Sequence, residues 1–161
     1  MKKTLVVLML FVMIISVGCA KEAVLKQEDV SNIGNNEVEK SNEISVTDVS
    51  GKEIILSEKP EKVISLYASF ADLWYEAGGD LVGICDSRTL PEKVADLPKV
   101  GKMSTPNVEA ILALEPDFII VRDGYVKQEE IIPLLIENNI VVYLANYNNF
   151  SEMLKVYKDF C

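Results

Sequence analysis

Short, fully apolar segments alternate with helix-like segments along most of this chain, and this alternation restricts the fold more than any other feature. The apolar segments lie within EKVISLY (61–67), LVGIC (81–85), DFIIV (117–121) and IVVYLA (140–145). Strands without polar alternation are buried on both faces, as in a parallel sheet covered by helices. The sequence therefore predicts an α/β fold with a doubly wound, Rossmann-like parallel sheet. Before it, ISVTDVSGKEIILS (44–57) alternates about a Ser-Gly pair and predicts a β-hairpin.

Helical segments connect or follow these strands, and two of them end in recognisable stop signals. The segments are ASFADLWYEAGG (68–79), NVEAILAL (107–114), KQEEIIPLLIENN (127–139) and SEMLKVYKDFC (151–161). Gly78 and Asn139 suit the left-handed residue that often ends a helix, and Pro133 is expected to interrupt the third helix. Trp74, inside the first helix, is expected in the core.

The segment GKMST (101–105) is expected to form a loop that leads into the second helix. Ser104 or Thr105 would be the N-cap of that helix, with Pro106 in its first position. With that cap, Glu109 has no capping role and points outward. Its side chain would then be either simply solvated or part of a contact surface.

The N-terminal region has the pattern of an export signal. Two lysines precede an apolar run over residues 5–17, and Gly18-Cys19 follows, so residues 1–18 are predicted to be a signal peptide. The run is shorter than the ~20 residues of a membrane-spanning helix. The cysteine after glycine resembles a bacterial lipobox, in which Cys19 would be acylated, for example with palmitate; an ordinary signal peptide or an uncleaved anchor is the alternative. Residues 19–43 predict a flexible tether, and residues 44–150 a single lobe.

Composition argues against several functions. The net charge of −9 disfavours nucleic acid, whose phosphates need basic partners. The sequence has no histidine and no metal-ligand spacing among its 3 cysteines, so no metal site is expected. Cys85 is expected to be a small buried hydrophobe. Because the sequence also lacks phosphate-binding glycine loops and nucleophile motifs, the chain is expected not to be an enzyme.

Polar side chains follow several of the predicted strands, where open parallel sheets bind their ligands. Both arginines of the chain, Arg88 and Arg122, lie in strand-end loops. A guanidinium suits carboxylate or chelate oxygens, although each arginine also has an aspartate close in sequence as an alternative partner. Tyr67 and Tyr125 follow strands as well, and each would either grip a partly apolar ligand or cover the core.

Four segments between residues 44 and 161 resemble the substrate-binding lipoproteins of ABC importers, specifically the class that binds ferric siderophores, haem and cobalamin. They are VTDVSGKEIILSEKPEKVISL (46–66), LVGICDSRTLPE (81–92), LPKVGKMSTPNVEAILALEPDFIIV (97–121) and LLIENNIVVY (134–143). The resemblance implies a class III periplasmic binding protein, in which one rigid helix joins two α/β lobes. This chain would supply the N-terminal lobe, residues 151–161 would begin the connecting helix, and the second lobe would be absent.

The resemblance also implies roles for individual residues. The expected ligand-facing residues are Tyr67, Ser87, Arg88, Met103, Ser104, Arg122 and Tyr125. Glu109 is expected to dock on the ABC permease, and through it the chain would work with the ATPase. A lipid on Cys19 would hold the protein at the extracytoplasmic face of the cell membrane.

The function implied by the resemblance is the capture of a ferric siderophore-type iron chelate for import, without a cofactor. Haem and cobalamin are alternative ligands. Cobalamin is disfavoured because Met103 stands where cobalamin binders that resemble this chain often carry an aromatic residue. The alternative function is a truncated surface lipoprotein that acts as an interaction module without transport.

Overall fold

The computed structural model describes residues 43–90 and 92–161. The predicted signal peptide, the predicted acylation site Cys19 and nearly all of the predicted tether lie outside the described residues. Among the helices of the described ranges, none combines the length and the apolar character needed to cross a membrane.

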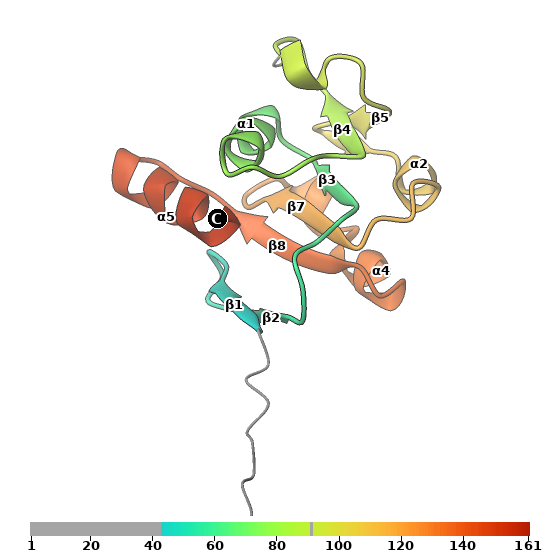
Figure 1. The fold of residues 1–161 in the computed structure, drawn as a ribbon. Coiled ribbons are helices and arrows are strands. Elements are labelled where there is room, and N and C mark those ends of the chain that lie inside the picture. Colours follow the sequence, from blue (N-terminus) through green and yellow to red (C-terminus); the bar gives the residue numbers. More distant parts are fainter. Residues whose placement is uncertain (1–42, 91) are drawn as a thin grey trace, which may run out of the picture. The chain divides into compact units, whose positions relative to one another are not determined.

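A six-stranded sheet in the order β6-β5-β4-β3-β7-β8 forms the centre of the described region (Figure 1). Its strands are β3 (Val63–Ser65), β4 (Gly83–Asp86), β5 (Lys99–Lys102), β6 (Thr105–Pro106), β7 (Phe118–Arg122) and β8 (Val141–Ala145). Neighbouring strands are parallel except for β5 and β6, which are antiparallel. From β3 the chain winds outward through β4 and β5, then returns to β7 on the other side. The strand order therefore reverses between β3 and β7, which is where doubly wound sheets open a ligand crevice.

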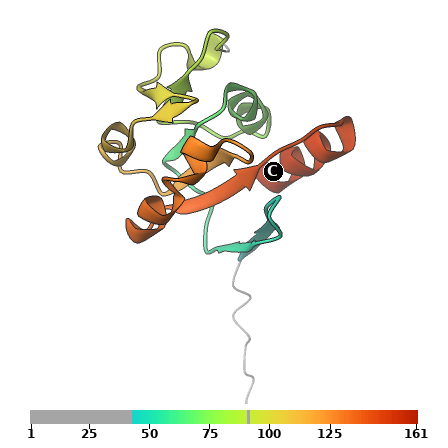
Figure 2. The same ribbon diagram turned by 180° about the vertical axis from the view of Figure 1, so that it is seen from behind.

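Helices cover both faces of this sheet (Figure 1, and Figure 2 from behind). One face is covered by α1 (Ala68–Glu76), by the single turn η1 (Glu92–Val94) and by α5 (Phe150–Phe160). The other face is covered by α2 (Val108–Leu112) and α4 (Ile132–Glu137), and α3 (Val126–Glu129) packs against β6 and β7. This arrangement confirms the α/β fold with a doubly wound, mostly parallel sheet.

Alternate strand residues enter two separate hydrophobic cores. Val63 and Phe118 join the core under α1 and α5, whereas their neighbours Ile64 and Ile119 join the core under α2 and α4. Trp74 is 3% exposed and stacks on Phe118 with ring centroids 6.0 Å apart. The expectation that Trp74 belongs to the core is confirmed. Burial of both strand faces explains why the sequence shows apolar runs rather than alternation.

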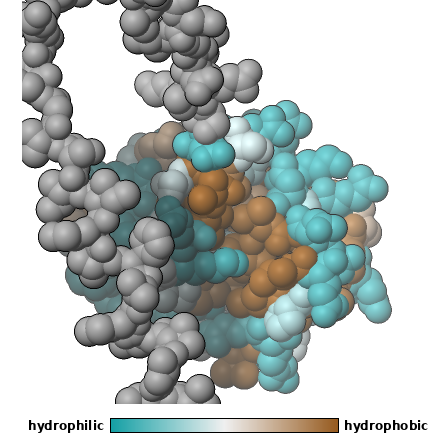
Figure 3. Space-filling model, turned by 90° about the horizontal axis from the view of Figure 1, so that it is seen from below, coloured by the Kyte–Doolittle hydropathy of each residue, from teal (hydrophilic) through white to brown (hydrophobic). Residues whose placement is uncertain are grey.

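The predicted hairpin is confirmed as β1 (Ile44–Thr47) paired antiparallel with β2 (Glu53–Leu56). Its turn is fixed by the buried carboxylate of Asp48, whose Oδ1 accepts from the amides of Ser50 and Lys52 at 2.9 and 3.1 Å. A small depression of about 130 Å³ separates the hairpin from the aromatic core residues and the end of α5. Figure 3 shows apolar surface on the side of the molecule seen from below in Figure 1.

The structure corrects the predicted start of the second helix. Residues 99–106 form the antiparallel pair of β5 and β6, so Thr105 and Pro106 belong to a strand rather than to a helix cap. The N-cap is Asn107, whose side chain accepts from the amide of Ala110 at 3.1 Å. The local signal Ser-Thr-Pro was misleading because pairing with β5 outcompeted the capping preference of the hydroxyl residues.

The third predicted helix is interrupted, as expected. It forms two short helices, α3 and α4, and Pro133 lies in the first turn of α4, where its missing N–H is not needed. Asn139 has the expected positive φ, 60°, after the end of α4. Gly78 likewise follows α1 with a φ of 81°, so both stop signals are confirmed.

Candidate functional site

Seven residues predicted from the sequence as ligand-facing lie at or just beyond the carboxyl ends of four parallel strands. Tyr67 follows β3, Ser87 and Arg88 follow β4, and Met103 and Ser104 form the turn after β5. Arg122 ends β7, and Tyr125 is the N-cap residue of the following helix α3. We call this set of seven residues, Tyr67, Ser87, Arg88, Met103, Ser104, Arg122 and Tyr125, the carboxyl rim.

Arg122 lies against two tyrosine rings of the carboxyl rim. Its guanidinium carbon is 4.5 Å from the ring centroid of Tyr67 and 5.6 Å from that of Tyr125. The two rings are themselves 6.1 Å apart and tilted by 59°. Cation–π contacts of this kind hold a planar guanidinium in a fixed orientation. Tyr67 also packs on the core, with its ring centroid 5.1 Å from that of Phe70. The alternative that Tyr67 covers the core is therefore confirmed, and a ligand contact by either tyrosine stays a prediction.

The alternative that the arginines pair with their neighbouring aspartates is wrong. Within the described part of the chain, neither Arg88 nor Arg122 forms an ion pair. The Asp123 carboxylate instead accepts from the Asn146 side-chain amide at 3.1 Å. The Nε atom of Arg122 is buried without a hydrogen-bond partner among the described residues. Because buried polar groups are nearly always paired, Arg122 retains an unused donor.

An open depression of about 660 Å³ lies beside Arg88. Its lining residues are Asp86, Ser87, Arg88, Lys102, Met103 and Ser104. A second depression of about 240 Å³ is lined by Ser104, Gly124, Tyr125, Val126 and Lys127. The two depressions share Ser104 and together extend along the rim. Lys102, Val126 and Lys127 were not predicted to be site residues. Each lies within two positions of a predicted site residue, Met103 or Tyr125, and this proximity in sequence could have identified them.

Gly101 shapes the turn that carries Met103 and Ser104. Its φ is +92°, and a Cβ atom there would lie 2.5 Å from the backbone nitrogen of Asn107. A side chain at this position would therefore force β5 and β6 apart. The tight turn presents Met103 and Ser104 at the edge of the larger depression.

Glu109 lies on the first turn of α2, and its side chain is exposed. The expectation that it points outward is confirmed, although the cap that frees it from capping is Asn107 rather than Thr105. A permease-docking role for Glu109 stays a prediction.

The described residues offer little for covalent or metal chemistry. The buried Ser65 hydroxyl donates to the carbonyl of Tyr67 at 2.8 Å. Burial, together with the charge of Asp86, raises the pKa of the Cys85 thiol to about 12, which keeps it protonated and unreactive. Within residues 43–90 and 92–161, no group of three or more cysteine, aspartate or glutamate side chains is arranged to hold a metal ion.

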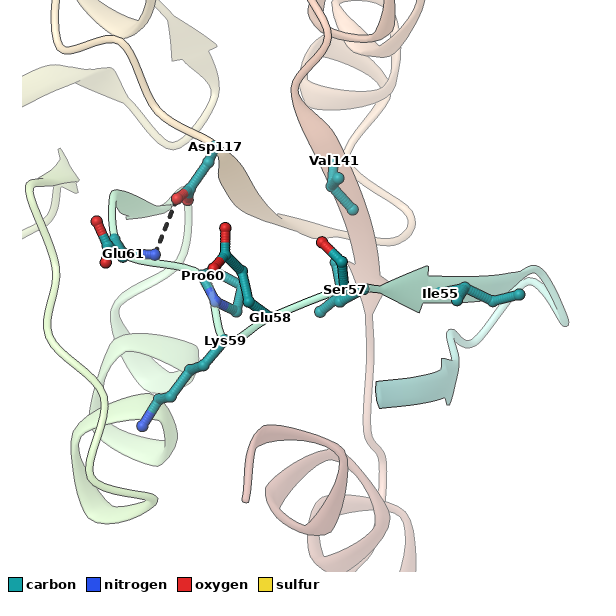
Figure 4. Close-up of a pocket in the computed structure, with 9 residues that line it drawn as sticks. Ile55, Ser57, Glu58, Lys59, Pro60, Glu61, Asp117 and Val141 are labelled. Atoms are coloured by element: carbon teal, nitrogen blue, oxygen red, sulfur yellow. Dashed lines mark hydrogen bonds between the residues drawn. The ribbon is translucent and has the colours of Figure 1, made fainter. Parts of the chain in front are cut away.

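A further depression of about 260 Å³ lies at the opposite end of the strands (Figure 4). We call this region, formed by residues 57–62, Glu115, Asp117 and Val141, the amino end. Figure 4 shows the Asp117 carboxylate pointing at the backbone of Glu61. It accepts from the amide of Glu61 at 2.8 Å and from that of Lys62 at 3.1 Å. The Asp117 carboxylate thus has its partners within the chain.

A family model described as "Periplasmic binding protein" matches residues 63–159. The lipoprotein YvrC of Bacillus subtilis, named as an uncharacterised ABC transporter substrate-binding lipoprotein, is 30% identical over 70% of this chain and 37% of its own length. The Fe(3+)-citrate-binding protein YfmC of B. subtilis is 28% identical over 92% of this chain and 48% of its own. The Fe(3+) dicitrate-binding periplasmic protein FecB of Escherichia coli is 34% identical over 50% and 31%. The chain thus spans less than half the length of these relatives.

Solved structures of similar proteins share the fold. The iron uptake ABC transporter substrate-binding protein PiuA of Streptococcus pneumoniae superposes with a TM-score of 0.58 and 26% identity, over 73% of this chain and 42% of that protein. The catecholate-siderophore binding protein VctP of Vibrio cholerae gives a TM-score of 0.60 at 15% identity, over 73% and 43%.

Proposed function

The chain belongs to the periplasmic binding protein family, and from this we propose that it is the extracytoplasmic solute-binding component of an ABC importer for a ferric siderophore-type chelate. The carboxyl rim would hold the chelate. The observation that carries the proposal is the position of Arg122: its guanidinium lies against Tyr67 and Tyr125 and keeps an unpaired Nε.

The charges of the rim favour an anionic ligand. Arg88 and Lys102 line the larger depression together with one acid, Asp86. Lys127 lines the smaller one and is paired with Glu130 at 2.7 Å. The excess of positive charge therefore comes from Arg88, Lys102 and the neighbouring Arg122. Each carboxylate of a ferric carboxylate chelate presents two coplanar oxygens, and the guanidinium of arginine can bind both at once. The tyrosine rings beside Arg122 would contact the apolar parts of the chelate.

The names of the relatives support this ligand class. YfmC and FecB are named as ferric citrate-binding proteins, and PiuA is named for iron uptake. All three are named as binding proteins rather than enzymes, and we expect this chain to bind its ligand without transforming it. We use ferric citrate as the probe of the proposal.

Delivery to a permease forms the second part of the proposal. Glu109 is exposed on α2, and a carboxylate there can pair with basic residues of a permease. Lipidation at Cys19 would keep the protein at the extracytoplasmic face of the membrane, close to that permease and its ATPase.

Isothermal titration calorimetry with ferric citrate tests the ligand class, with iron-free citrate, haem and cobalamin titrated in parallel. We expect heat of binding from ferric citrate and a loss of affinity of about tenfold or more in Arg122→Ala, since hydrogen bonds to charged groups contribute ~1.5–3 kcal/mol. Lys62→Ala is the matched control, because it removes a cation from the amino end instead.

Two outcomes would refute the proposal. One is the absence of binding by any ferric chelate, together with binding of haem or cobalamin. The other is equal affinity of the Arg122→Ala and Lys62→Ala variants for ferric citrate, which would separate the ligand from the carboxyl rim.

A further inference from the structure

Gln128 on α3 is a polar side chain without any exposed surface. Its Oε1 accepts from the backbone N–H of Arg122 at 2.9 Å. Its Nε2 donates to the carbonyl oxygens of Leu66 at 3.0 Å and Met103 at 2.9 Å. One side-chain amide thus connects the loops that follow β3, β5 and β7, which are the loops that carry most of the carboxyl rim.

The position of this amide follows from the pairing of β3 with β7. In the parallel ladder, the amide of Leu66 donates to the carbonyl of Ile120 at 2.9 Å. The next bond of a regular parallel ladder would run from the amide of Arg122 to the carbonyl of Leu66. Both of these groups bond to Gln128 instead. The side-chain amide therefore takes the place of one ladder bond and acts as a spacer between the two backbones.

This spacer lies at the point where the strand order reverses, between β3 and β7. Tyr67 leaves the sheet directly after Leu66, and Arg122 ends β7. Separation of the two strands here sets the distance between the Tyr67 ring and the Arg122 guanidinium. The hydrogen bond from Gln128 Nε2 to the Met103 carbonyl holds the turn after β5 in place relative to β3 and β7.

From these contacts we infer that Gln128 is a positioning residue for the ferric chelate, acting through Tyr67, Met103 and Arg122 without touching the ligand. The inference rests on the proposed function for its ligand. Removal of the amide leaves one backbone N–H and two carbonyls without partners, unless β3 and β7 close into a regular ladder. Buried groups that lose a partner are costly, so closure of the strands is the expected response, and it would alter the rim.

Two variants of similar side-chain size separate this role from simple packing. Gln128→Met keeps the volume and removes all three hydrogen bonds. Gln128→Glu keeps the acceptor for the Arg122 amide and removes both donors. Leu135→Ala is the control, because Leu135 is fully buried in the core under α2 and α4 and is not part of the rim.

We expect both Gln128 variants to bind ferric citrate at least tenfold more weakly than the wild-type chain in calorimetry. Leu135→Ala should bind within twofold of wild type, even where its loss of stability in urea unfolding is larger. In NMR spectra, the nuclear Overhauser contact between the Arg122 Nε–H and the Tyr67 ring should disappear in Gln128→Met and persist in Leu135→Ala.

The inference is overturned if both Gln128 variants bind within twofold of wild type, or if affinity falls only in proportion to stability in all three variants. Absence of ferric citrate binding by the wild-type chain, with binding of haem or cobalamin in its place, would count against the proposed function instead. The NMR comparison then still decides the role of Gln128, since an unchanged Arg122–Tyr67 contact in Gln128→Met and in Gln128→Glu contradicts positioning.

Discussion

The two ends of the central sheet differ in how their polar groups are satisfied. At the amino end, Asp117 accepts two backbone amides, and Lys62 pairs with Glu115 at 3.2 Å. Near the carboxyl rim, the Arg122 Nε and the Asn146 Oδ1 are buried without hydrogen-bond partners within the described ranges. Both ends carry depressions, but within the described region buried side-chain polar atoms without a partner occur only near the carboxyl rim.

This difference shows why a depression alone does not identify a binding site. Asp117 at the amino end serves local structure, because its carboxylate caps the segment that leads into β3. The exposed ion pair Lys62–Glu115 contributes little to stability and pairs one cation at this end with an acid of the same chain. At the carboxyl rim the arginines have no acidic partner in the described part of the chain, and their charge is free to act on a ligand.

The largest expected effect is on the rate of chemical modification of Cys85. This rate tests whether solvent reaches the interior of the sheet below the carboxyl rim. Cys85 is fully buried on β4, next to Asp86, which lines the larger depression. Because burial raises its pKa from 9.0 to about 12, its thiolate fraction at pH 8 falls by about 1000-fold, and only the thiolate reacts. We expect a thiol reagent to modify Cys85 at least about 1000-fold more slowly in the folded chain than in urea.

This measurement uses a chain with Cys19→Ser and Cys161→Ser, so that Cys85 is the single thiol. Modification of the folded chain within about tenfold of the unfolded rate would show that solvent enters the sheet below the rim. The predicted difference between the solvent-accessible carboxyl rim and the closed interior of the sheet would then be wrong.

The second prediction concerns the geometry of Arg122. Arg122→Lys keeps the positive charge but loses the planar fork and its contact with both tyrosine rings. We expect a loss of ferric citrate affinity of about tenfold in calorimetry. Arg88→Lys is the matched control at the same rim; since Arg88 is exposed, we expect a change of about threefold or less. Equal effects of the two substitutions would mean that charge alone attracts the ligand.

The third prediction is that a substitution at the amino end changes the stability of the chain and leaves its affinity for the chelate unchanged. Asp117→Ala removes the acceptor of the Glu61 and Lys62 amides, and loss of a comparable capping side chain costs ~0.5–2 kcal/mol. We expect urea unfolding to show a loss of about 1 kcal/mol, with ferric citrate affinity unchanged within twofold. Glu58→Ala, in the same depression, should change the stability by less than about 0.5 kcal/mol. Weaker chelate binding by Asp117→Ala would place ligand contacts at the amino end.

The smallest effect in solution is expected at Glu109. Glu109→Gln changes one exposed side chain on α2, so stability should stay within about 0.5 kcal/mol and ferric citrate affinity within twofold. Iron uptake by cells that carry the matching permease should fall, because the docking charge is lost. Altered chelate affinity in this variant, or unaltered uptake, would contradict a docking role that is separate from the rim.

The sequence predicted the position of the carboxyl rim, because most of its residues directly follow predicted strands. Once β3, β4 and β7 are recognised, the loops after them must meet at one edge of the sheet, and Arg122, Tyr67 and Tyr125 lie there together. The turn at Met103 was placed correctly, although residues 99–106 form two strands that the sequence did not reveal. These strands are short and partly polar, and their pairing depends on β4 as a neighbour.

Local chemistry in the sequence determined the alternation of strands and helices, the two helix ends at Gly78 and Asn139 and the order of the loops, because these features depend on burial and backbone preferences of nearby residues. The tertiary structure alone decided what each rim side chain contacts. Gln128 bonds to Leu66 across 62 positions and to Met103 across 25, and nothing next to Gln128 in the sequence indicates these partners. A hydrogen bond between distant residues exists only after the winding of the sheet has brought them together, which is why the spacer between β3 and β7 could not be predicted.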